Sequence, residues 1–184
     1  MMSFSEFRKP LLPGWRQTGE TGGVMLEKNS HFFDLFNWFA GANPKRVIGV
    51  GDNNATSESP LIDNCVVTVE YENGGRASLF MCLFSEYGGG YPFNIVGDKG
   101  RLIVFLDENR LIHYNRTDEK VQEWKFKDKQ EELLHHGILE EHQMFIQALR
   151  EGKPVLVDGD AARWAMKVSL AAEQAVAGET VVNV

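Results

Sequence analysis

Two alternating segments, residues 64–72 and 76–84, flank the sequence Asn73-Gly74-Gly75 in the middle of the chain. Such alternation is typical of half-buried strands, and a short loop rich in Asn and Gly between them predicts a β-hairpin. A three-residue loop that pairs Glu72 with Arg76 places most apolar side chains on one face, because side chains alternate across a sheet. That face then contains Tyr71, Val69, Val67 and Cys65 opposite Ala77, Leu79, Met81 and Leu83.

The register also separates the two cysteines. Cys65 and Cys82 fall on opposite faces of the hairpin, so we expect no disulfide between them. The second face still carries Val66, Phe80, Cys82 and Phe84. Helices can cover one face, and the other needs a partner surface, a ligand or a second subunit. The pattern therefore predicts self-association through the sheet.

Similar patterns predict the elements on either side of the hairpin. Residues 1–21 contain several prolines and glycines and are expected to form an irregular lead-in or linker. Helices are expected at about 30–40, at 138–150 (its start at about 133 or 138), and from a cap at Asp158 to about 177. Further strands are expected at 45–51, 91–96, 101–105, 110–114, 123–126 and 180–184. This order predicts an α+β fold, a mainly antiparallel open sheet with helices packed on one face.

Composition excludes several classes of function. A net charge of −7 and a pI near 5.3 disfavour binding to nucleic acid or to an anionic membrane. No apolar run approaches the roughly 20 residues of a membrane span, and no signal peptide is visible, so we expect a cytoplasmic protein. Gly49-x-Gly51 has Asn54 where a dinucleotide-binding fingerprint needs a third glycine. The two cysteines lack the short spacing of a zinc site.

Glu27 and His31 are the strongest candidates for chemistry, because they lie four residues apart at the head of an apolar helix. On a helix this spacing puts both side chains on one face, where a carboxylate can orient an imidazole as a general acid/base. Two other interpretations stay open: a helix-start acid beside a packed histidine, or a metal site completed by a distant histidine. Asp34 is expected in the first turn of the helix, where an acidic side chain interacts favourably with the helix dipole.

Other residues offer a weaker signal. Trp15-Arg16 could supply a stacking surface and an anion-binding fork, or could simply pack. A glycine run at 88–90, next to Tyr91, could let a ligand approach the backbone, or could be a flexible loop. His135, His136 and His142 are expected in a solvated turn and on a helix face.

The run from Gly22 to Leu35 resembles the motif that opens the C-terminal domain of the glucose-fructose oxidoreductase/inositol dehydrogenase/MocA (Gfo/Idh/MocA) family. Weaker similarities are residues 95–100 and the chain end from Phe145 through Pro154 and Ala171 to Val184. The resemblance implies an α+β domain like the C-terminal domain of dihydrodipicolinate reductase. In this family that domain follows a dinucleotide-binding (Rossmann) domain, which the 184 residues do not contain.

The resemblance also implies a function. The family transfers hydride reversibly between NAD(P) and a sugar, polyol or related alcohol. His31 would be the acid/base, and Glu27 would replace an acid, commonly Asp, that orients it. Residues expected to face the substrate are Lys28, Trp15, Arg16 and Tyr91. Residues 22–184 would be one substrate-binding and oligomerisation domain, inactive alone, with neither NAD(P) nor metal bound to it. The alternative is a stand-alone, non-catalytic ligand-binding or scaffold module.

Overall fold

The computed structural model describes residues 1–7, 22–55, 61–85, 89–90, 92–106, 108–126, 137–178 and 181–184. Its helices are α1 (Gly23–Glu27), α2 (Asn29–Ala40), α3 (Ile138–Glu151) and α4 (Gly159–Gly178). Its strands are β1 (Met2–Phe7), β2 (Pro44–Asp52), β3 (Asn64–Tyr71), β4 (Arg76–Cys82), β5 (Gly89–Gly90), β6 (Phe93–Val96), β7 (Gly100–Phe105), β8 (Arg110–Asn115), β9 (Val121–Lys125) and β10 (Val181–Asn183). The helices and strands expected from the sequence are all present, at bounds within a few residues.

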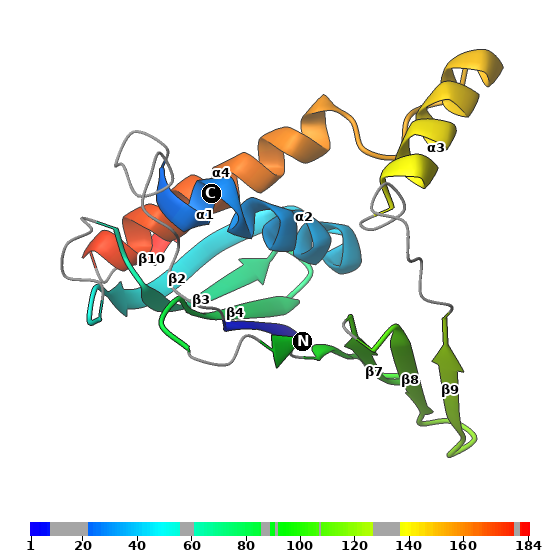
Figure 1. Cartoon of the computed structure of the whole chain (residues 1–184), viewed down its shortest axis with the longest axis horizontal. Helices are drawn as coiled ribbons and strands as arrows, with labels where there is room; N and C mark the ends of the chain where they lie inside the picture. The colour runs from blue at the N-terminus through cyan, green and yellow to red at the C-terminus, as the bar shows by residue number, and fades with distance from the viewer. Residues whose placement is uncertain are drawn as a thin grey trace.

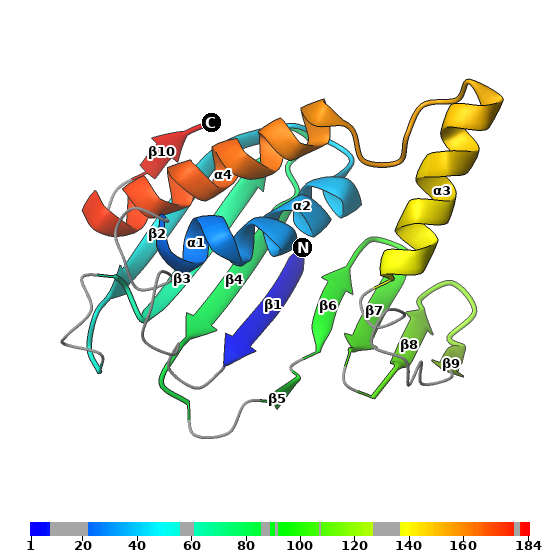
Figure 2. The ribbon, with the colours of Figure 1, turned by 45° about the horizontal axis from the view of Figure 1, so that its top comes forward.

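The strands of the described residues form a single ten-stranded sheet in the order β10-β2-β3-β4-β1-β6-β7-β8-β9, with β5 beside β1. β1 runs parallel to β4, and the other pairs are antiparallel. Helices α1, α2 and α4 lie over one face of the half that contains β2, β3, β4 and β1 (Figures 1 and 2). The predicted α+β class with a mainly antiparallel open sheet is confirmed.

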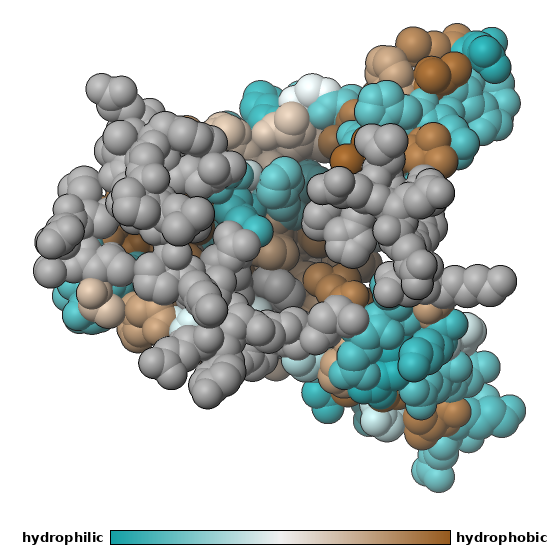
Figure 3. All heavy atoms as spheres, in the orientation of Figure 1, coloured by the Kyte–Doolittle hydropathy of each residue, from teal (hydrophilic) through white to brown (hydrophobic). Residues whose placement is uncertain are grey.

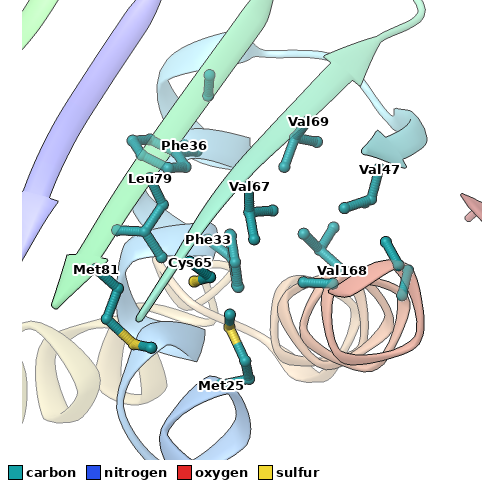
Figure 4. Close-up of a cluster of buried hydrophobic side chains, with 14 of the residues drawn as sticks. Met25, Phe33, Phe36, Val47, Cys65, Val67, Val69, Leu79, Met81 and Val168 are labelled. Atoms are coloured by element: carbon teal, nitrogen blue, oxygen red, sulfur yellow. The ribbon is translucent and has the colours of Figure 1, made fainter. Parts of the chain in front are cut away.

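The core fills the space between β2–β4 and the helices above them (Figure 4). Burying these apolar side chains is the main driving force for folding of the domain, at roughly 25 cal/mol per Å² removed from water. Phe33 and Phe36 of α2 and Val168 of α4 are fully buried against the sheet. The buried apolar residues of β2–β4 in this core are Val47, Cys65, Val67, Val69, Tyr71, Ala77, Leu79 and Met81. The apolar face predicted for the hairpin is thus the face that is buried.

The register of the hairpin differs from the prediction by two residues. Glu70, not Glu72, pairs with Arg76, and Cys65 pairs with Met81. The loop does have three residues, but it comprises 72–74, because the amide of Tyr71 donates to the carbonyl of Gly75 at 3.0 Å. Gly74 takes the left-handed position with φ of 81°. A shift of two residues leaves every side chain on its predicted face. Both cysteines are free thiols, as expected.

Residues 2–7 form a strand, so the prediction of an irregular lead-in is wrong for this segment. β1 pairs with β4 from Met2↔Ala77 to Phe7↔Cys82, and Met2 is buried. The prolines and glycines that suggest an irregular segment begin at position 10. The segment before position 10 is too short for its periodicity to identify it as a strand. Residues 2–7 are stable as a strand because they pair with β4.

The two C-terminal helices differ in their packing. Asp158 caps α4 as predicted, because its Oδ1 accepts from the amides of Asp160 and Ala161 at 3.0 Å each. α4 packs on the core through Val168, Ala172 and Ala175, which form one face of the helix. α3 forms over the predicted residues, but none of its residues is buried. It stands apart from the helix layer (Figure 2).

The face of β2–β4 away from the helices is partly exposed and apolar. Val50 is 55% exposed and Phe80 39% exposed, and Ile48, Val66 and Phe84 are similarly uncovered. Glu70 lies on the same face, where Arg46 and Arg76 pair with it and hold the pKa of its carboxyl below the usual value. This uncovered face is the second apolar face expected from the sequence.

Truncation of Phe36 tests the core. Its ring lies 6.4 Å from that of Phe33 and 5.5 Å from that of Phe93. We expect Phe36→Ala to lower the free energy of unfolding by about 3–5 kcal/mol, measured by urea denaturation, because it removes packing and leaves a cavity. Phe80→Ala, on the open face, should cost less than about 1 kcal/mol. Equal losses in the two variants would contradict the assignment of the core.

Candidate functional site

The glycine pair at Gly22-Gly23 starts the segment that carries the candidate site. Both residues have positive φ, 69° and 60°, a conformation that other residues adopt at a cost. They turn the chain into α1, where Val24 and Met25 are buried in the core. The pair therefore fixes the direction in which α1 enters the helix layer.

α1 and α2 are two helices joined at Lys28, not the single continuous helix that the spacing of Glu27 and His31 suggests. Lys28 has φ of −120° and ψ of −46°. Its amide still donates to the carbonyl of Val24 at 3.0 Å, and its carbonyl accepts from the amide of His31 at 3.2 Å. Glu27 ends α1, and His31 lies in the first turn of α2. The four-residue step crosses a break, so the pairing of these two side chains stays a prediction.

His31 is exposed, whereas Glu27 and Lys28 beside it are half-buried. The exposed position suits a group that must reach a substrate. The junction below it is anchored by Asn29, which is fully buried. Its Nδ2 lies 3.5 Å from Sδ of Met25 and 3.2 Å from Sδ of Met81, within reach of weak hydrogen bonds to sulfur. The first turn of α2 is thus fixed to both α1 and β4.

Asp34 is a second acid close to His31. Burial raises the pKa of the Asp34 carboxyl above its ordinary value, and the charge of His31 partly offsets this shift. His31 and Asp34 are three residues apart within α2, so their side chains share one helix face. The spacing His31-x-x-Asp34 is visible in the sequence. From the sequence alone, however, the only role proposed for Asp34 is a favourable interaction with the helix dipole.

A cavity of 510 Å³ continues from Asp34 along the exposed side of α2. Its walls come from α2, from the turn that follows α2, from residues 156–157 and from the first turns of α4. The lining is mostly apolar, with Trp38 of α2 and Trp164 of α4, and its polar groups include Asp34 and Asn37. The described lining residues are Asp34, Leu35, Asn37, Trp38, Gly41, Ala42, Asn43, Pro44, Leu156, Val157, Ala161 and Trp164.

Asn37 links the cavity to the core of the sheet. Its Oδ1 accepts a hydrogen bond from the hydroxyl of Tyr71 at 3.0 Å, and burial raises the pKa of Tyr71. The Asn37 Nδ2 is buried, and no described group accepts from it. The contact connects α2 to the end of β3 and fixes the rotation of the helix that carries His31.

Three of the residues expected to face a substrate, Trp15, Arg16 and Tyr91, lie outside the described residues. His135 and His136 do so as well. Within the described part of the chain, no group of three His, Cys, Asp or Glu side chains is arranged to hold a metal ion. In the same residues, no helix is both long and apolar enough to cross a bilayer.

The raised pKa of Asp34 leads to a pH-dependent stability. A carboxyl whose pKa is higher in the folded chain destabilises that chain when ionised, and the penalty disappears as the pH falls through the folded value. We therefore expect Asp34→Asn to raise the urea midpoint at about pH 7 and to leave it unchanged at about pH 3. A lower midpoint for the variant at neutral pH would contradict the burial argument.

Comparison with known proteins places this geometry in a family. The family description "Oxidoreductase family, C-terminal alpha/beta domain" (Gfo/Idh/MocA) matches residues 3–184. Myo-inositol 2-dehydrogenase of Thermotoga maritima is 24% identical over 173 residues, which are 92% of this chain and 51% of that protein. The scyllo-inositol 2-dehydrogenase (NAD(+)) of Bacillus subtilis is 23% identical over 145 residues, 77% of this chain and 42% of that protein. The chain thus spans about half the length of these relatives.

Solved structures agree on the fold. UDP-N-acetylglucosamine 3-dehydrogenase from Acidithiobacillus ferrooxidans aligns with a TM-score of 0.77 at 20% identity, over 97% of this chain and 54% of that one. A levoglucosan dehydrogenase in complex with NADH aligns with a TM-score of 0.81 at 15% identity, over all of this chain and 57% of that one. The chain belongs to the Gfo/Idh/MocA oxidoreductase family and has the fold of its C-terminal α/β domain.

Proposed function

We propose that this chain is the substrate-binding half of an NAD(P)-dependent oxidoreductase that acts on a sugar, polyol or related alcohol. The observation that carries the proposal is the exposed His31 in the first turn of α2, on a helix whose other face is locked into the core. The family match and the inositol and sugar dehydrogenases among the relatives support it. The cofactor-binding half would be a nucleotide-binding domain outside these 184 residues.

His31 would move the proton of the reacting hydroxyl. When the alcohol is oxidised, its carbon would lose a hydride to the acceptor that NAD(P)⁺ supplies, and the hydroxyl would lose its proton to the imidazole, so that a carbonyl group forms. In the reverse direction the imidazolium returns that proton to the oxygen. A positioned acid/base of this kind contributes typically about 10²–10⁴-fold to a rate.

Neighbouring groups would support that role. Glu27 would orient the imidazole from the end of α1, and Lys28 would contact the substrate. Asp34, three residues after His31, would place a second carboxyl group on the His31 face of α2. Trp15, Arg16 and Tyr91 complete the proposed substrate side.

The cofactor would supply the hydride acceptor, and in this proposal a second domain holds it. Gly49, in the one glycine pattern that resembles a fingerprint, faces α4, and a Cβ there would lie 2.9 Å from Cγ2 of Val176. The glycine thus permits close packing of α4 on β2, not an approach to a pyrophosphate. In the complete enzyme a second domain would hold the nicotinamide next to His31.

Titration of the chain with NADH tests whether cofactor binding requires a second domain. We expect no change in cofactor fluorescence at millimolar NADH, because the proposal assigns the dinucleotide to a second domain. Myo-inositol 2-dehydrogenase from Thermotoga maritima serves as the positive control. Saturable binding to this chain alone would contradict the need for a second domain.

A chimera tests the role of His31. The half of the Thermotoga maritima enzyme that this chain does not match is fused ahead of residue 1, and oxidation of inositols and sugars is measured by NADH formation. His31→Ala should lower turnover by roughly 10²–10⁴-fold. His113→Gln, on the distant β8, should leave turnover within about twofold of the parent. A near-normal rate for His31→Ala would reduce His31 to a structural residue.

We also propose self-association through the open face of the sheet. Val50 and Phe80 are prominent on that face, and a buried apolar cluster is typical of homodimer interfaces. The double substitution Val50→Asp/Phe80→Asp should shift the chain to a monomer in sedimentation velocity at concentrations where the parent self-associates. A monomeric parent, or an unchanged oligomer in the double variant, would contradict this proposal.

A further inference from the structure

Asn29, the first residue of α2, is a polar side chain in the apolar core. None of it is exposed to solvent. Apolar side chains at the surface, such as those of α3 in Figure 3, are common in folded proteins. A fully buried side-chain amide is uncommon, because its oxygen and its two N–H groups give up their hydrogen bonds to water. The partners of Asn29 therefore decide whether this residue stabilises the fold.

The side-chain amide of Asn29 has poor partners. Its Nδ2 lies 3.5 Å from Sδ of Met25 in α1 and 3.2 Å from Sδ of Met81 in β4. Figure 4 shows both methionines in this part of the core. A thioether sulfur is a weak acceptor, and no described group donates to the buried Oδ1 of Asn29. An amide that exchanges water for two weak bonds and leaves its oxygen without a donor lowers the stability of the fold.

Two other polar side chains are fully buried among the described residues, and both have stronger partners. The carboxylate of Asp63 accepts from the amide of Asn54 at 3.0 Å. The hydroxyl of Ser169 donates to the carbonyl of Ala165 at 2.9 Å. Bonds of this kind offset much of the cost of burying a polar group. Asn29 differs from both, because its polar contacts are to sulfur.

The position of Asn29 connects it to the break between α1 and α2. Lys28, which carries the break, directly precedes it, and His31 follows two residues later. Asparagine is a poorer former of continuous helix than leucine, which has nearly the same shape. In coiled coils, a single buried asparagine selects one register at a cost in stability. The contacts of Asn29 with α1 and β4 select, in the same way, the geometry in which α2 begins after a break.

We infer that Asn29 is a positioning residue that sets the placement of His31 relative to Glu27, at a cost in stability. This inference rests on the proposed function, because it concerns the placement of the imidazole which that function requires. Phe33 and Phe36 anchor α2 in the core. If the break closed, α1 and α2 would form one helix, and Glu27 would shift relative to His31.

Asn29→Leu tests the inference in this chain alone, because leucine has the branched shape of asparagine without its polar atoms. We expect the midpoint of thermal unfolding to rise by about 2–6 °C, since a poorly bonded amide leaves the core. In NMR spectra, the Cα chemical shift of Lys28 should move to the range of helical residues, and the ring signals of His31 should shift. The signals of His113, on the distant β8, should stay in place. An unchanged Lys28 signal would overturn the inference.

A second substitution tests whether the contact with sulfur carries the effect. Met81→Leu, a change that nearly conserves volume, removes the nearer acceptor of the Asn29 amide. It should lower the midpoint, and Asn29→Leu should then raise the midpoint by more than it does in the parent chain, because residues in contact are coupled. Equal effects of Asn29→Leu in the two backgrounds, or a lower midpoint for Asn29→Leu in the parent, would overturn the inference.

Turnover of the chimera with the Thermotoga maritima half separates positioning from packing. Asn29→Leu should lower kcat at least about tenfold and leave KM within about threefold, because a displaced imidazole impairs the reaction more than binding. Ser169→Ala, at a buried polar residue of α4, should leave both constants within about twofold. Unchanged kcat for Asn29→Leu, in a chimera that His31→Ala inactivates, overturns the inference alone. Near-normal turnover for His31→Ala contradicts the proposed function instead.

Discussion

Packing of α2 and α4 on the apolar face of β2–β4 is the interaction on which the rest of the molecule depends. Phe33 and Phe36 anchor α2, and Val168 with its alanine neighbours anchors α4. Since residues one turn apart share a helix face, fixing the buried side of α2 also fixes its exposed side. His31, Asp34 and Trp38 are therefore presented in a row by the same contacts that fold the domain. A substitution that shifts the buried side of α2 therefore also shifts the residues of the candidate site.

Much of the fold is predictable because its signals are local. The alternation around Asn73-Gly74-Gly75 indicates the hairpin and its buried face, and Asp158 indicates the start of α4. The predicted register is wrong because a three-residue loop fits the sequence at two adjacent positions, and only the bond from Tyr71 to Gly75 distinguishes them. β1 escapes prediction because its stability comes from β4, which is distant in the sequence, and no local pattern reports such a pairing.

The sequence proposes residues for the site but does not give their geometry. Spacing selects Glu27 and His31 as candidates on the assumption of a continuous helix, and the helix breaks at Lys28. The break accompanies burial of Asn29 between two methionine sulfurs, a tertiary contact that periodicity does not reveal. The electrostatic link between His31 and Asp34 depends on how deeply Asp34 is buried, which also follows only from the packed structure.

Among the described residues, two apolar surfaces are uncovered, and they lie in different places. One lies behind the sheet, and the other continues from the helix that carries His31. The central proposal is that His31 of α2 acts on a substrate that lies next to a cofactor held by another domain. The most direct test is a crystal structure of a complete enzyme that contains this chain, with NADH and a ketone substrate analogue bound. The account predicts that His31 lies within hydrogen-bond reach, about 2.6–3.2 Å, of the analogue's oxygen, while the nicotinamide carbon lies roughly 3–3.5 Å from the reacting carbon. An imidazole that faces away from the nicotinamide would contradict it.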